Sequence, residues 1–258
     1  MLGGAGPLVP ALVASSLTLS ACQRPAPAGE PPVQVAAASD LTLAFEELGR
    51  LFEQRSGRQL TLSFAASGAL ARQLSQGAPF DVFAAANTAF VERAVEDGAC
   101  DGSSITRYAR GHVVAFSRSD GVPLASLSTL AEPSVQRVAI ANPEHAPYGK
   151  AAREALERAG LWRAVQHKIV QAENVRQALQ LAESGNADVA LVSLALVAGD
   201  ARGQRLALDP TLYAPIEQSL VVCQHGKNQR GGRDFARLVS SAEGQAILRR
   251  YGFASPSE

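Results

Sequence analysis

The sequence predicts an α/β fold built on mostly parallel β-sheet, and three patterns in its 258 residues support this class. Short apolar runs alternate with longer stretches in which apolar residues recur at helical spacing. Several of these runs are almost continuously apolar, as expected for strands that are buried on both faces. Regular strand–helix alternation favours a mostly parallel sheet with helices on both faces.

The expected strands are eight runs of five or six residues. In chain order they occupy residues 33–38, 59–64, 80–85, 112–117, 137–141, 168–172, 188–192 and 218–223.

The expected helices lie between these runs, at residues 41–52, 87–98, 149–160, 174–184 and 233–250. In the first, Leu41, Phe45, Leu48 and Phe52 fall on one helical face. The second and fourth begin with an asparagine that is expected to cap the helix. Ser240 and Glu243 match a capping box, which predicts that the last region is two helices with a break at this point.

The N-terminal segment is typical of an export signal. Residues 1–21 carry no charge, and the apolar part from Leu8 to Ala21 is shorter than the ~20 residues that a membrane-spanning helix needs. It ends in LSAC, which resembles the lipobox of bacterial lipoproteins, where the preceding peptide is removed and the cysteine, here Cys22, receives lipid. The segment departs from the usual pattern because it lacks an early Lys or Arg, and an ordinary cleaved signal remains the alternative.

Residues 23–32 (QRPAPAGEPP) are rich in Pro and Ala and are expected to form an extended tether. The folded part from about residue 33 to 253 is long enough for two modest lobes or one large domain. The formal net charge is zero, so nothing indicates a nucleic-acid partner. Cys100 and Cys223 form a disulfide or remain two separate buried thiols; the sequence leaves both open.

Small neutral hydrogen-bond donors follow several expected strands. Ser39, Ser67 and Ser193 stand at strand ends, and asparagines at 142 and 174 do the same. In an α/β sheet these positions meet where helices begin, and a helix N-terminus favours an anion without any Lys or Arg. For each residue taken singly, a simple helix cap is the alternative. Asp40 would repel an anion, so we expect its side chain to point away and cap the helix.

Motifs for other chemistries are not found. The four histidines have no zinc-like spacing, and no nucleophile elbow, phosphate loop or dinucleotide fingerprint occurs. A Ser-His-Asp arrangement is not ruled out, but nothing selects a triad. We therefore expect no catalytic residues and no cofactor.

Several segments together resemble the periplasmic molybdate-binding proteins, in order along residues 33–253. They are AAAS at 36–39, SFAASG at 63–68, LARQ at 70–73, GAPFDVF at 77–83, ANPEHAPYG at 141–149, ENVR at 173–176, GNAD at 185–188 and RRYGF at 249–253.

The resemblance implies a two-lobed periplasmic-binding-protein fold, each lobe a mostly parallel sheet flanked by helices, with two crossover strands near 112–117 and 218–223. The first lobe would comprise residues 33–111 plus 219–254 and the second residues 112–218, after a signal at 1–22 and the tether at 23–32.

The resemblance also implies the binding site. Ser39 and Ser67 would donate from the first lobe, and the backbone N–H groups of Tyr148 and Val175 from the second. Some members place a Tyr hydroxyl where this chain has Ser193, which is shorter and is expected to bind through water or not at all.

The implied function is capture of molybdate or tungstate for the permease of an ABC importer. The expected protein is a monomer on the periplasmic side of the cell envelope, held to a membrane by its lipid anchor. The alternatives are another small oxyanion such as sulfate, an oxyanion-sensing lipoprotein, or an enzyme.

Cys22→Ala should release the protein from membranes or leave its signal uncleaved, because the thiol that accepts lipid is gone. Stable attachment requires more than one acyl chain, since a single chain binds a bilayer only marginally. The measurement is incorporation of labelled fatty acid, and a wild-type protein that takes up no label would refute the anchor.

Overall fold

The computed structural model describes residue 1 and residues 29–199 and 203–256. The lipid site expected at Cys22, and nearly all of the signal and tether before residue 29, lie outside these residues. Among the described residues no helix is long and apolar enough to cross a bilayer.

The end of the expected tether contacts the fold. Arg58 donates from Nε to Glu30 Oε2 at 2.7 Å, and Asn228 donates from Nδ2 to the carbonyl of Pro31 at 2.7 Å. The segment is therefore held against the protein from residue 30, slightly before the first strand.

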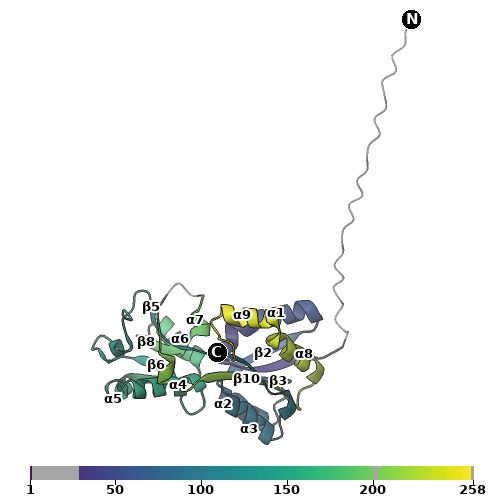
Figure 1. Cartoon of the computed structure of the whole chain (residues 1–258), viewed down its shortest axis with the longest axis horizontal. Coiled ribbons are helices and arrows are strands. Elements are labelled where there is room, and N and C mark those ends of the chain that lie inside the picture. Colours follow the sequence, from purple (N-terminus) through teal and green to yellow (C-terminus); the bar gives the residue numbers. More distant parts are fainter. Residues whose placement is uncertain (2–28, 200–202, 257–258) are drawn as a thin grey trace.

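Two five-stranded sheets lie side by side (Figure 1). The first has the order β2-β1-β3-β10-β4, and its strands are β2 (Leu60–Ala65), β1 (Val33–Ala38), β3 (Val82–Ala85), β10 (Ile216–Val222) and β4 (Thr106–Gly111). The second has the order β7-β6-β8-β5-β9, with β7 (Ile169–Ala172), β6 (Val138–Ala141), β8 (Val189–Ser193), β5 (Val113–Arg118) and β9 (Gly203–Ala207).

Helices cover both faces of each sheet, which makes two lobes (Figure 1). On the first sheet, one face carries α1 (Thr42–Ser56), α8 (Gln229–Ser240) and α9 (Ala242–Arg250), and the other α2 (Ser67–Ser75) and α3 (Thr88–Glu96). On the second, α4 (Pro147–Arg158) and α5 (Trp162–Val165) lie opposite α6 (Val175–Glu183) and α7 (Leu194–Val197). The α/β fold of two lobes that the sequence predicted is confirmed.

Each sheet is mixed, with four strands running in one direction and one strand, β10 or β5, running against them. In both, the first three strands of the order pair in parallel and the last two pairings are antiparallel. The chain passes from the first sheet to the second between β4 and β5, which only His112 separates, and it returns between β9 and β10. All four of these strands take part in antiparallel pairings. Since Ile216 pairs with Gly111, β10 lies wholly in the first sheet, starting before the boundary expected at 218/219.

The sequence did not predict β4 and β9. Their sequences, TRYARG and GQRLA, are largely polar and contain no apolar run, whereas the other two edge strands, β2 and β7, contain apolar residues and were predicted. Helix starts were predicted better: Asn87 and Asn174 cap α3 and α6. The break between α8 and α9 is present, but Ser241, not Ser240, caps α9 by accepting from Gly244 N at 3.1 Å.

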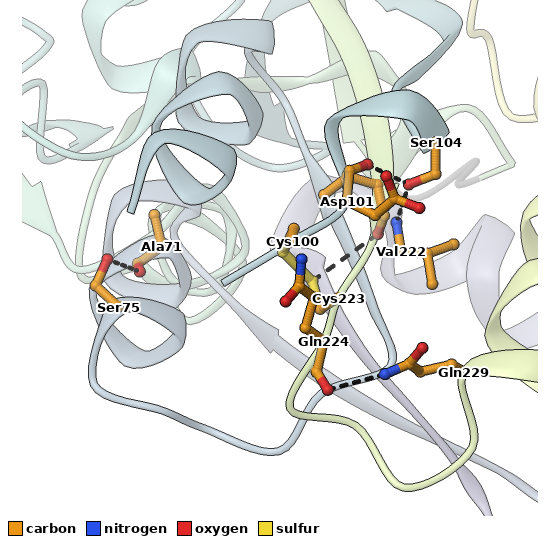
Figure 2. Close-up of a disulfide and its surroundings, with 10 residues drawn as sticks. Ala71, Ser75, Cys100, Asp101, Ser104, Val222, Cys223, Gln224 and Gln229 are labelled. Carbon is orange, nitrogen blue, oxygen red and sulfur yellow. Dashed lines mark hydrogen bonds between the residues drawn. A yellow bond between two sulfur atoms is a disulfide. The ribbon is translucent and has the colours of Figure 1, made fainter. Parts of the chain in front are cut away.

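Cys100 and Cys223 are joined by a disulfide across 123 residues of chain (Figure 2). The bond links the segment after α3 to the end of β10, and both residues are buried in a small apolar cluster of the first lobe. The neighbouring backbone supports the same junction, because Asp101 N donates to Val222 O and Gln224 N to Ala99 O.

Replacing both cysteines of this pair by alanine should lower the free energy of unfolding by about 5 kcal/mol in the chain-entropy model for a loop of this length. Denaturant unfolding of the variant and the wild type measures the difference. Intact-mass analysis after alkylation supplies the control: two free thiols per chain beyond Cys22 would contradict the disulfide.

Candidate ligand-binding site

A small cavity lies between the two lobes, where four helices begin. Its empty space is about 190 Å³, including the part open to solvent. The lining residues come from both lobes and are Ala38, Ser39, Asp40, Ala65, Ala66, Ser67, Ala86, Ala146, Pro147, Tyr148 and Val175. Four of the five residues expected to bind the ligand are thus brought together.

The first lobe contributes two buried serines. Ser39 opens the 3-10 helix η1 (Ser39–Leu41), directly after β1 and before α1. Ser67 is the first residue of α2, and its Oγ accepts a hydrogen bond from Ala86 N at 3.1 Å. Because that bond uses a lone pair of the oxygen, the hydroxyl hydrogen of Ser67 stays available to donate.

The second lobe contributes backbone N–H groups. Pro147 and Tyr148 begin α4, and the first N–H groups of a helix have no partner within it. At the start of α6, Asn174 Oδ1 accepts from Arg176 N and Gln177 N at 3.1 and 3.0 Å. This cap leaves the N–H of Val175 as the amide of the first turn that can donate to a ligand.

The cavity offers donors without any cationic side chain. No Lys, Arg or His stands among its lining residues, so the positive potential comes from the N-terminal ends of the helices. Such a site suits a small anion whose oxygens only accept hydrogen bonds. Among the described residues no cluster of His, Cys, Asp and Glu could hold a metal ion.

Ser193 does not line the cavity. It is the last residue of β8, is fully buried, and caps α7 by accepting from Ala195 N at 3.2 Å. Its hydroxyl lies instead near the phenol of Tyr148, whose pKa it tends to lower.

Asp40 lines the cavity, contrary to the expectation that it points away as a helix cap. No side chain caps η1 or α1. The carboxylate accepts from Gln218 Nε2 at 2.6 Å, and burial raises the pKa of Asp40 to about 7, although the bond from Gln218 acts in the opposite sense. This carboxyl therefore gains or loses its proton near neutral pH.

The phenol of Tyr148 is a feature that the sequence did not predict. Its hydroxyl is buried and lies so close to Gly111 that a Cβ there would be 2.0 Å away. Burial raises the pKa of Tyr148 well above its ordinary value, and the nearby Asp40 adds to the rise. Only the backbone N–H of this residue was expected to bind the ligand. No local sequence pattern indicates that the phenol reaches Gly111 at the end of β4.

The lobes touch across the mouth of the cavity. Gly68 N, in the first turn of α2, donates to the carbonyl of His145 in the second lobe at 2.9 Å. A Cβ on Gly68 would lie 2.7 Å from His145 Cβ. The closed arrangement therefore requires a residue without a side chain at position 68.

The family model for bacterial extracellular solute-binding proteins matches residues 33–254. The molybdate-binding protein ModA of Rhodobacter capsulatus is 34% identical over 232 residues, 90% of each chain. ModA of Azotobacter vinelandii is 31% identical over 224 residues, which are 86% of this chain and 89% of that protein. The solved structure of the Azotobacter vinelandii periplasmic molybdate-binding protein superposes with a TM-score of 0.82 at 28% identity, covering 87% of this chain and 99% of that one.

Gly68→Ala should weaken oxyanion binding by about tenfold or more, because an added methyl group in a tightly packed contact costs roughly 1–3 kcal/mol. The unliganded protein should keep its stability, since Ala is the better helix former. Calorimetric titration with a panel of oxyanions measures the affinity. Gly199→Ala, whose Cβ would meet nothing within 4 Å, is the matched control. Wild-type affinity in Gly68→Ala would show that the contact is not needed.

Proposed function

The chain belongs to the family of bacterial extracellular solute-binding proteins, and from this premise we propose that it captures molybdate or tungstate and delivers it to the permease of an ABC importer. The observation that carries the proposal is the cavity between the lobes, which offers hydroxyl and backbone N–H donors to a ligand and has no cationic side chain in its lining. The similarity to the ModA proteins supports the choice of ligand.

The ligand's protonation explains why such a site favours it. Molybdate and tungstate are fully deprotonated at neutral pH and can only accept hydrogen bonds. A site made of donors binds them and disfavours an anion that must itself donate from a protonated oxygen. Sulfate is also a bare dianion, so the donors do not exclude it, and the size of the cavity must do so.

The protein acts by binding and release, without turnover. Of the two serines in the cavity, Ser67 has its Oγ hydrogen-bonded to the backbone N–H of Ala86 and not to a side chain that could act as its general base. Gly68 N donates to His145 O between the lobes. We propose that ligand stabilises this closed arrangement relative to an open one, and that the permease distinguishes the two. We further propose that the lipid on Cys22 holds the protein to a membrane on the periplasmic side of the cell envelope. We also propose that the protein is a monomer.

Ser39→Ala and Ser67→Ala should each weaken molybdate binding by roughly ten- to hundredfold. Each removes a hydrogen bond to a charged acceptor, worth ~1.5–3 kcal/mol. Titration calorimetry on the purified protein measures this, and one molybdate per chain is expected, with sulfate and phosphate bound far more weakly.

The matched control is Ser75→Ala at the other end of α2, where the hydroxyl is hydrogen-bonded to Asp97 Oδ2 and Ala71 O and is not among the cavity-lining residues. It should bind molybdate like the wild type, and Ser193→Ala should cost much less than either cavity serine. Unchanged binding in both Ser39→Ala and Ser67→Ala, or equal competition by sulfate, would overturn the proposal.

A further inference from the structure

Two buried polar atoms beside the cavity have no hydrogen-bond partner: Oδ1 of Asp40 and the hydroxyl of Tyr148. They come from opposite lobes, and both residues line the cavity. A buried polar atom without a partner is costly and rare in folded proteins, so it needs a physical reason. Here the two atoms lie close enough for each residue to shift the pKa of the other.

The Asp40 side chain cannot turn away from an arriving ligand. Its Oδ2 is held by Gln218 Nε2 at 2.6 Å, and the hydroxyl of Tyr108 is 3.4 Å from Gln218 Oε1 on the far side. All three residues are at most 1% exposed, so the carboxyl has no exposed surface away from the cavity towards which it could turn. The carboxyl therefore stays beside the cavity when a ligand enters.

An ionised Asp40 would destabilise a doubly charged oxyanion bound in this cavity. Like charges repel strongly where water is excluded, and one member of such a pair is then protonated. Molybdate and tungstate do not take up a proton near neutral pH. The proton must therefore be carried by Asp40.

We propose that the oxyanion is bound together with one proton, which resides on Asp40, and that this neutral carboxyl sets the preference for fully deprotonated oxyanions. The inference rests on the proposed function and adds the residue that determines its specificity. A neutral carboxyl leaves the cavity without a competing negative charge and adds a donor for Tyr148 or the ligand. An ionised Asp40 would be an acceptor and would select an anion that carries its own proton, such as hydrogen phosphate.

The two phenols that interact with Asp40 supply no alternative proton carrier. Tyr108 on β4 and Tyr148 on α4 face it, and burial raises the pKa of both phenols well above the ordinary value. Arg110, on the same strand as Tyr108, pairs with Glu217. Beside η1, α7 and β2 carry no ionisable residue, and Arg176 of α6 lines a separate groove.

The direction of the pH dependence follows from the pKa of Asp40. Burial places that pKa at about 7 before a ligand is present, and a bound dianion raises it further. Where the free protein is ionised and the loaded protein is protonated, binding takes up a proton, and affinity falls about tenfold for each unit of rising pH. Below this interval both forms are protonated, and affinity does not change with pH.

The experiment is titration calorimetry of the purified protein with sodium molybdate at pH 6 and pH 8, in buffers of different ionisation enthalpy, which gives the number of protons exchanged. The wild type should take up close to one proton per molybdate at pH 8 and bind more weakly there than at pH 6. Asp40→Asn keeps an acceptor for Gln218 and mimics the neutral carboxyl. It should exchange almost no proton and bind equally at both pH values. Asp120→Asn, which alters an exposed carboxylate, should behave like the wild type.

Molybdate binding by the wild type with no proton uptake would overturn the inference while leaving the proposed function in place. Proton uptake that persists in Asp40→Asn would place the proton elsewhere and would also overturn it. Tight phosphate binding at pH 8 that is lost in Asp40→Asn would mean that Asp40 is an ionised acceptor, the opposite of the proposal. No molybdate binding at either pH would refute the proposed function itself and the inference with it.

Discussion

Holding a doubly charged anion out of water without a cationic side chain is the constraint that shapes this molecule. Backbone N–H groups and hydroxyls can do it only if several of them point at one place. A helix start supplies only a few such groups, and its cap uses some of them, so several helices must begin around one cavity. The alanines of its lining leave room for helix ends to approach and add no charge of their own; they are Ala38, Ala65, Ala66, Ala86 and Ala146.

The topology meets this constraint by building the site in two halves. Each sheet brings two helix starts to the same edge, α1 with η1 and α2 in one lobe, and α4 and α6 in the other. Neither half has the full set of donors, and water can enter between them until Gly68 meets His145. The chain passes from the first sheet to the second at residues 111–113, and the Tyr148 phenol packs against Gly111. Because Tyr148 also lines the cavity, this one residue contacts both the connection between the lobes and the ligand site.

Strands with an apolar run could be predicted from the sequence, and strands without one could not. Apolar runs identified the central strands and the edge strands β2 and β7, while the largely polar β4 and β9 gave no such signal. In the site, Ser39 and Ser67 could be found because their position after a strand fixes where they lie. Asp40 and Ser193 were placed less well, because the direction of a side chain depends on tertiary partners, here Gln218 and Ala195.

A crystal structure of the protein grown with tungstate, with the tungsten located by its anomalous scattering, tests the central claim most directly. The expected result is a single tungsten position between the lobes, with its oxygens in reach of the Ser39 and Ser67 hydroxyls and the N–H groups of Tyr148 and Val175. Tungsten bound at surface cations, or a cavity that stays without it, would contradict the idea that neutral donors at helix starts capture the oxyanion.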